Sequence, residues 1–252
     1  MKMIVCMGFI IQLAIASSCK PDKIADPNNN EPETGVVKGK VTDASGKPIA
    51  GATIVINNTV FFNKNIVLTT NAGGEYRVKM PATDSWYVRG FVNISYNGLV
   101  YELQLHPEFA GAFTGMDGKI VNLVLKSSGQ VPPDFGHSGY YGGKILAQSV
   151  LLNLNDLYGV ELTLEPVGPM IDGSSGITIK QTSTKHANEF ILEDVPMGRY
   201  KVSAKLNGDP LYLNPVKGDP FAQYKLSHIM DFEPSYPGAT TYRIAVNLST
   251  EP

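Results

Sequence analysis

The stretch from Gly39 to Ile56, GKVTDASGKPIAGATIVI, constrains the fold of this chain more than any other part of the sequence. Apolar and polar residues alternate on both sides of its centre, as they do in strands that bury one face. At the centre, Asp43 can hydrogen-bond the backbone two residues on, Gly46 can adopt a positive φ, and Pro48 cannot donate to a central strand ladder. The stretch therefore predicts a hairpin, in which two strands are joined by a turn.

A second pattern follows at residues 70–78, TNAGGEYRV, where a glycine-rich turn precedes a strand that opens with an aromatic residue. Together, the two patterns resemble the carboxypeptidase regulatory-like domain, whose signature is G-x-V-x-D-x-x-G-x-P-I-x-G-A-x-V followed by T-x-x-x-G-x-Y. The resemblance covers residues 35–126. It implies a small β-sandwich of the transthyretin (prealbumin) type, without the catalytic domain of a carboxypeptidase.

The composition of the whole chain favours an all-β fold of two tandem small domains. Glycine and proline are frequent, with 25 and 17 residues among 252, and no segment sustains a helical period. A linker rich in proline, glycine and serine occupies residues 127–139 and separates a first domain, residues 35–126, from a second, residues 140–252. We therefore predict two β-sandwich domains in tandem.

The strongest hairpin signal in the first domain is Asn97-Gly98, because both residue types tolerate the positive φ of a two-residue turn. Residues 86–96 and 99–105 flank it, and the second of these segments alternates between apolar and polar side chains. We predict that this segment turns Leu103 toward the core as its most buried residue, while Glu102 faces water.

The second domain echoes the first in several short patterns. Gly143-Lys144-Ile145 corresponds to Gly39-Lys40-Val41, and Leu206-Asn207-Gly208 corresponds to Tyr96-Asn97-Gly98. The segment FILEDVPMGRYKV, residues 190–202, adds a strand pattern that is common in such sandwiches. We interpret the second domain as a diverged copy of the first. An unrelated Ig-like β domain is the alternative, because it carries similar strands and turns.

The N-terminal residues have the composition of an export signal followed by a membrane anchor. Residues 1–18 combine Lys2 with an apolar run too short to span a bilayer, as in a signal peptide. Ala16-Ser17-Ser18 precede Cys19 and resemble a bacterial lipobox, which implies that Cys19 is acylated and becomes the first mature residue. An ordinary signal peptide cleaved near Ser18 is the alternative. Residues 19–34 are polar and rich in asparagine and proline, which predicts a flexible tether.

Several enzyme classes and ligands are disfavoured by the sequence. No G-x-S-x-G motif is present, and Cys6 leaves with the signal peptide, so we predict no catalytic nucleophile. A net charge of −2 without a basic block argues against nucleic acid. We expect no metal and no cofactor, because the four histidines lie far apart and outside any zinc-binding spacing. They are His106, His137, His186 and His228.

Aromatic pairs are the remaining candidates for a binding site, because sugars stack their apolar faces on exposed rings. We predict four ligand-binding residues in two adjacent pairs, since neighbours on a strand point to opposite faces and one ring of each pair can be exposed. In the alternative interpretation, Trp86 is a core residue and Tyr87 is a half-buried strand residue. The four residues are Trp86, Tyr87, Tyr140 and Tyr141.

Modules with this resemblance are widespread in lipoproteins and outer-membrane nutrient receptors of Bacteroidota-type bacteria. The resemblance implies a non-enzymatic lipoprotein, held in the bilayer of the outer membrane through acylated Cys19, on its periplasmic face or at the cell surface. Its expected role is binding or scaffolding, with carbohydrate or an envelope protein as partner. The alternative is an accessory subunit of a cell-envelope hydrolase, or such a hydrolase itself, with a site at the domain junction.

Overall fold

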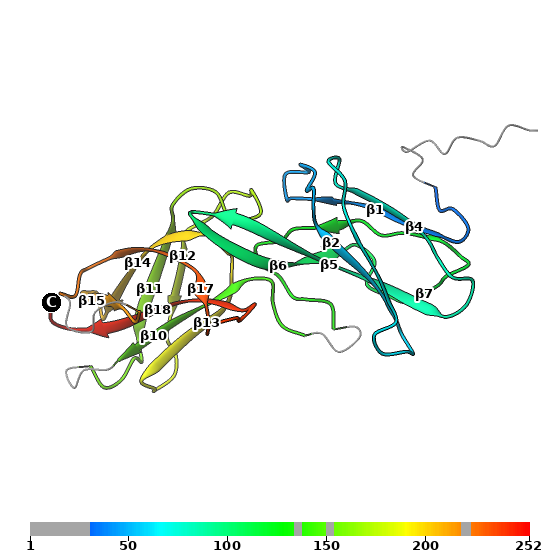
Figure 1. Cartoon of the computed structure of the whole chain (residues 1–252). Coiled ribbons are helices and arrows are strands. Elements are labelled where there is room, and N and C mark those ends of the chain that lie inside the picture. The colour runs from blue at the N-terminus through cyan, green and yellow to red at the C-terminus, as the bar shows by residue number, and fades with distance from the viewer. Residues whose placement is uncertain (1–30, 134–137, 150–153, 218–222) are drawn as a thin grey trace, which may run out of the picture. The chain divides into compact units, whose positions relative to one another are not determined.

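The computed structural model describes residues 31–133, 138–149, 154–217 and 223–252. The predicted signal peptide, Cys19, most of the predicted tether and His137 lie outside these ranges. The regular elements of the described residues are all strands, and they form two sheets of nine strands each (Figure 1). The prediction of an all-β fold is confirmed. Among the residues that the structure places, no helix is long and apolar enough to cross a membrane.

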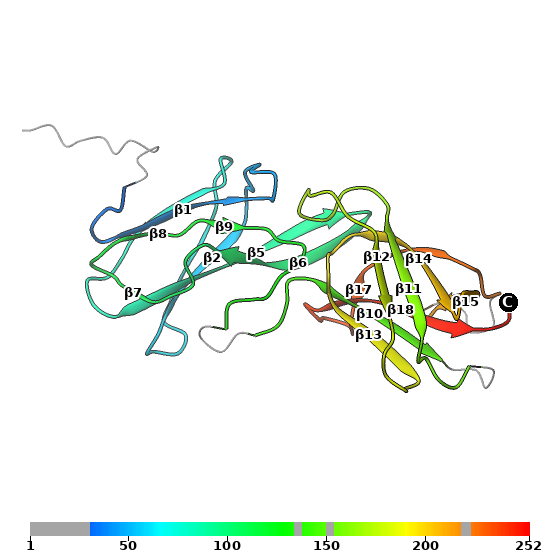
Figure 2. The same ribbon diagram turned by 180° about the vertical axis from the view of Figure 1, so that it is seen from behind.

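The first sheet runs in the order β3-β2-β5-β6-β9-β1-β4, with β7 beside β5 and β8 beside β1. Figure 2 shows β8 and β9 lying along β1. β6 pairs first with β5 and then, at its end, with β9, so the sheet curls around its core. Its strands are β1 (Val36–Thr42), β2 (Thr53–Asn58), β3 (Asn65–Thr69), β4 (Glu75–Lys79), β5 (Ser85–Tyr96), β6 (Leu99–Pro107), β7 (Phe113–Thr114), β8 (Lys119–Ile120) and β9 (Leu123–Val124).

The core of this curled sheet is tightly packed. A methyl group built on Gly90 of β5 would lie 2.7 Å from Cδ2 of Leu123 on β9, which is too close for a real contact. The inward residues along β2 alternate as predicted, because Ala52 just before the strand, and Ile54 and Ile56 within it, are each 0% exposed. Period-two alternation therefore located the inner face of the strand correctly.

The predicted hairpin between residues 39 and 56 forms only next to its turn. Thr42 and Pro48 make an antiparallel bridge there, but β1 and β2 do not pair with each other. β1 pairs with β4 and β9, whereas β2 pairs with β3 and β5, so the loop between them carries the chain from one part of the curled sheet to another. Asp43 Oδ1 accepts hydrogen bonds from the N–H groups of Ser45 and Lys47, both at 2.9 Å, and Gly46 has a φ of +85°. Alternation reports which face of a strand is buried, but it does not report which strand is its neighbour.

The predicted hairpin at Asn97-Gly98 is confirmed. These residues have φ values of +50° and +84°, and Tyr96 at the end of β5 lies opposite Leu99 at the start of β6. The prediction that Leu103 is the most buried residue of β6 is wrong, because Leu103 is 6% exposed and Leu105 is 0% exposed. The end of β6 lies in the centre of the sheet, where it pairs with both β5 and β9, so burial is deepest there.

The second sheet repeats the topology of the first. Its order is β12-β11-β14-β15-β18-β10-β13, with β16 beside β14 and β17 beside β18. Every pairing of the first sheet recurs nine strands later, except that β8 pairs with β1 whereas β17 pairs with β18. The predicted echo is therefore present in the strand order. The strands are β10 (Gly143–Ser149), β11 (Val160–Pro166), β12 (Ile179–Thr182), β13 (Glu189–Val195), β14 (Arg199–Leu206), β15 (Asp209–Pro215), β16 (His228–Asp231), β17 (Glu233–Pro234) and β18 (Tyr242–Ser249).

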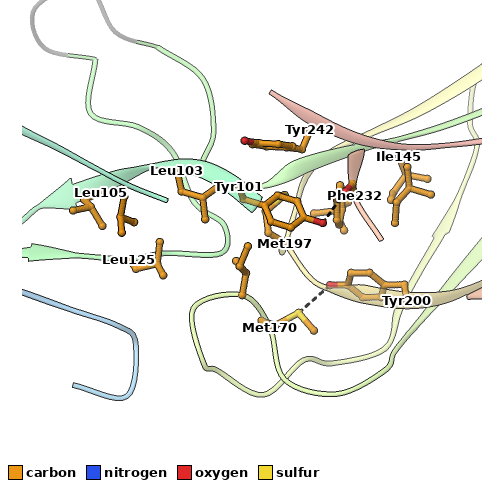
Figure 3. Close-up of a cluster of buried hydrophobic side chains, with 14 of the residues drawn as sticks. Tyr101, Leu103, Leu105, Leu125, Ile145, Met170, Met197, Tyr200, Phe232 and Tyr242 are labelled. Atoms are coloured by element: carbon orange, nitrogen blue, oxygen red, sulfur yellow. Dashed lines mark hydrogen bonds between the residues drawn. The ribbon is translucent and has the colours of Figure 1, made fainter. Parts of the chain in front are cut away.

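Buried side chains from both sheets belong to one cluster, part of which is drawn in Figure 3. Polar atoms beside this cluster are hydrogen-bonded between the sheets: Tyr101 Oη donates to the backbone oxygen of Phe232, and Tyr96 Oη donates to that of Pro169, each at 2.8 Å. Residues 32–252 form one compact unit. The division into independent domains at the predicted linker stays a prediction.

Candidate functional site

A groove with a volume of about 580 Å³ lies where the two sheets meet, and it contains two of the residues predicted to bind a ligand. We call it the junction groove. Part of its lining comes from β5 and β6, and part comes from residues 138–142 and 240–242. The side chains that bear on its chemistry are Arg89, Phe91, Lys126, Tyr140, Tyr141 and Tyr242.

Arg89 is the residue of the junction groove whose hydrogen bonding is incomplete. It lies on β5 two residues before Phe91, so both side chains leave the same face, and its guanidinium carbon is 4.9 Å from the centre of the Phe91 ring. Its Nε atom is buried and has no hydrogen-bond partner among the described residues. Burial lowers the pKa of Arg89, but a guanidinium remains charged at neutral pH. Because a buried donor without a partner is costly, an acceptor on a bound ligand would fit here.

Tyr141 lines the junction groove with an uncharged side chain. Its side chain is 8% exposed, and its hydroxyl oxygen lies 3.1 Å from Nδ1 of His106. Burial raises the pKa of Tyr141 to about 12, so the phenol keeps its proton at neutral pH. The pKa of His106 is lowered by burial and then by the charge of Lys126, so its imidazole is neutral at pH 7. The contact between the two rings is therefore uncharged under ordinary conditions.

Tyr140 is 49% exposed beside the groove, and backbone contacts hold its segment in place. It forms a β-bridge with Gln130. Asp194 accepts hydrogen bonds from the N–H groups of Gly129 at 2.8 Å and Gly142 at 3.2 Å, and so ties the segment to β13. An exposed ring on a fixed backbone presents a face on which a sugar ring can stack.

The other predicted aromatic pair does not belong to the groove lining. Trp86 is 1% exposed in the core of the first sheet, where its Nε1 donates to the backbone oxygen of Thr83 at 3.2 Å. A buried ring has no face for a sugar, so the prediction of Trp86 as a ligand-binding residue is corrected to its alternative, a core residue. Tyr87 is half-buried on β5. The structure thus brings Tyr140 and Tyr141 together and leaves Trp86 in the core.

Sequence reasoning missed Arg89, Phe91 and Lys126. A signal for the first two was present in YVRGF, residues 87–91, where tyrosine, arginine and phenylalanine occupy alternate positions and therefore share a face. The sequence around Lys126 gives no such signal. This residue follows β9, and it lines the groove because of the direction in which the chain leaves the first sheet.

The acidic groups of the junction groove are largely engaged by protein partners. Glu193 forms an ion pair with Lys144 at 2.7 Å, and Asp194 accepts two backbone N–H groups. Neither Arg89 nor Lys126 forms an ion pair with an acidic side chain within the described ranges. The same ranges contain no group of three side chains that could hold a metal ion. The groove therefore suits a ligand with acidic or hydroxyl oxygens.

Comparison with known proteins supports the predicted resemblance for part of the chain. The model of the carboxypeptidase regulatory-like domain matches residues 36–98, which contain β1 to β5 and the first hairpin turn. No curated protein matches the chain. Residues 36–98 are therefore similar to this domain class, and the rest of the chain is described by its fold alone.

Solved structures that match this chain include the following three bacterial proteins. The Bacillus anthracis TIE protein is 13% identical over 87% of this chain, with a TM-score of 0.32, and this chain covers about a third, 34%, of its length. GBS52, a minor pilin of Streptococcus agalactiae, is 13% identical over 87% of this chain and 98% of its own, with a TM-score of 0.29. A DUF3823 family protein from Bacteroides ovatus is 11% identical over 79% of this chain and 99% of its own, with a TM-score of 0.24.

Proposed function

We propose that this chain is a non-enzymatic binding module of the bacterial outer membrane, lipid-anchored through Cys19, and that its junction groove binds an acidic glycan. The observation that carries the proposal is the buried Nε of Arg89, which has no partner among the described residues and lies in a groove beside the exposed ring of Tyr140. Either the periplasmic face or the cell surface would suit this role.

The proposed binding mode combines two ordinary interactions. A sugar ring stacks on Tyr140, and a carboxylate or sulfate on the sugar accepts hydrogen bonds from the planar guanidinium of Arg89. Lys126 adds a second positive charge to the same groove. A neutral sugar would satisfy the buried donor less well, because hydrogen bonds to charged acceptors are the stronger ones.

Replacing Arg89 by methionine is expected to weaken binding to an array of uronic-acid and sulfated glycans by about tenfold or more, because a charge-assisted hydrogen bond is lost while the apolar stem stays over Phe91. Arg77→Met is the matched control, since Arg77 lies on β4 and pairs with Glu33 away from the groove. Equal binding of the wild type and the Arg89→Met variant to every glycan on the array would contradict the proposed site.

The alternative of a hydrolase at the junction predicts turnover that depends on a groove carboxylate. Glu102 is the acidic side chain to test, because Glu193 and Asp194 are engaged by Lys144 and by backbone N–H groups. Hydrolysis of any member of a glycoside and ester substrate panel, abolished in Glu102→Gln, would replace the binding proposal by an enzymatic one.

The lipid anchor is tested by metabolic labelling with a fatty-acid analogue. We expect label in the wild type and no label in Cys19→Ala, because Cys19 supplies the thiol that is acylated. Cys6→Ala is the matched control and should keep its label, since Cys6 is the only other cysteine and lies inside the predicted signal peptide. Label that persists in Cys19→Ala would show that this residue is not the anchor.

A further inference from the structure

Three consecutive apolar residues project into solvent in the loop between β2 and β3. Val60 is 72% exposed, Phe61 is 54% exposed and Phe62 is 95% exposed, and we call these residues the apolar tip. A run of three exposed apolar residues is unfavourable in water and is not expected on a surface unless a partner covers it.

The apolar tip is held in its exposed conformation by specific contacts. Asn58 Oδ1 accepts hydrogen bonds from the N–H groups of Val60 at 2.9 Å and Phe61 at 2.8 Å. Lys64 at the other end of the loop pairs with Asp84 at 2.6 Å and lies over the Phe61 ring at 5.1 Å. The loop therefore has a defined shape that keeps Phe62 pointing away from the sheet, so little order has to be gained when a partner binds.

The apolar tip lies at the end of the first sheet that is remote from the second sheet. Thr59 N–H donates to the backbone oxygen of Ser85, the first residue of β5, at 2.9 Å. The second sheet is contacted from the opposite end of β5, where Asn97 Nδ2 donates to Asp231 at 2.8 Å. The twelve residues of β5 separate the two ends by roughly 40 Å.

Val36, the residue at which the chain enters the first sheet, lies at the same end of the sheet as the apolar tip. β1 begins at Val36, which lies opposite Lys79, the last residue of β4. Only residues 80–84 separate Lys79 from Ser85 at the start of β5, whose backbone oxygen accepts the hydrogen bond from Thr59 next to the apolar tip. Sixteen residues lie between Cys19 and Val36, and a linker of that length spans roughly 20 Å.

We infer that the apolar tip inserts into the lipid surface to which the N-terminus is anchored, and so orients the first sheet on the membrane. The inference rests on the proposed lipid anchor at Cys19. An acylated Cys19 would place a lipid surface near this end of the sheet. The boundary between the headgroups and the acyl chains of such a surface accommodates exposed phenylalanine and valine side chains. The second sheet, bonded at the far end of β5, is then held away from the bilayer with the junction groove accessible.

The test uses the full mature chain with Cys19→Ser and an N-terminal hexahistidine tag, bound to vesicles of phosphatidylethanolamine, phosphatidylglycerol and a nickel-chelating lipid. Because this chain has no other thiol once Cys6 is removed, Val60→Cys gives a single site for an environment-sensitive fluorophore. Val100→Cys is the matched control, since Val100 is 68% exposed in the hairpin at the other end of β5. The tag replaces the acyl chain, so the result does not depend on whether Cys19 is acylated in the cell.

Emission from the label at residue 60 is expected to rise by about twofold or more on vesicles and to shift to the blue, with no change at residue 100. Adding Phe61→Ser and Phe62→Ser to the Val60→Cys chain should remove most of that rise. The single variant Phe62→Ser should lower it without changing the melting temperature, because a side chain with 95% exposure does not pack in the core.

Equal emission from the two labelled positions would overturn the inference, and so would a rise that survives both serine substitutions. If the label at residue 60 responds instead to protein concentration without vesicles, the partner of the apolar tip is a second copy of this chain and the inference is also wrong. Failure of fatty-acid labelling would remove the proposed anchor separately.

Discussion

Substitution of Gly39 by alanine is expected to lower the free energy of unfolding by about 3 kcal/mol, because a methyl group at this position has no room. Its Cβ would overlap the backbone oxygen of Val121 and would lie 2.9 Å from the Tyr76 ring. That oxygen also accepts a hydrogen bond from Tyr76 Oη at 2.6 Å, and Val121 N–H donates to Lys38 at 2.9 Å. The clash therefore falls on backbone that is fixed on both sides and cannot move independently.

Gly46→Ala is the matched control for this prediction. Gly46 has a φ of +85° but nothing within 4 Å of its Cβ position, so alanine would meet only backbone strain and cost about 1 kcal/mol. Chemical denaturation of the wild type and the two variants measures the difference. Equal destabilisation by both substitutions would show that close packing at Gly39 is not what requires a glycine there.

Leu105→Ala is expected to lower the free energy of unfolding by roughly 2–5 kcal/mol, because it leaves a cavity at a fully buried site. Leu105 is 0% exposed, and its Cδ1 would lie 2.9 Å from a methyl group on Gly90, so the surroundings are close-packed. Thermal and urea denaturation, read by the fluorescence of the buried Trp86, follow the loss.

Glu102→Ala on the same strand should change stability by less than about 0.5 kcal/mol. The Glu102 side chain is exposed, and its contacts with Tyr242 are made by backbone atoms that alanine retains: its N–H donates to Tyr242 Oη at 2.8 Å, and its carbonyl oxygen accepts from that hydroxyl at 3.2 Å. Similar losses in Leu105→Ala and Glu102→Ala would mean that the inward and outward faces of β6 are wrongly assigned.

Local features of the fold could be predicted from the sequence because each depends on a few neighbouring residues. Asn97 and Gly98 determine the turn of their hairpin, and the inward positions of β2 follow from alternation with period two. The partner of β1 could not be predicted, because it pairs with β4 and with β9 across long stretches of chain. The pairing of strands that are distant in sequence depends on the whole core, so it cannot be predicted from any short segment.

The candidate site could be predicted only in part for the same reason. Tyr140 and Tyr141 were found as a pair of aromatic residues near the linker, and both line the junction groove. Trp86 was proposed on the same grounds, but its ring fills the core of the first sheet. Arg89 was missed because its importance comes from a buried Nε atom without a partner among the described residues, and that property exists only in the folded groove.

The parallel pairing of the first and last strands in each sheet determines when folding can finish. Val41 on β1 lies beside Leu123 on β9, and Lys144 on β10 lies beside Arg243 on β18, so each sheet closes only after its last strand has been synthesised. Such non-local pairing gives slow folding. Because the two sheets have the same strand order, the misfolded product that we expect is one in which β1 pairs with β18 instead of β9. The order of synthesis opposes this error, since β9 leaves the ribosome and is available to β1 before β18 exists.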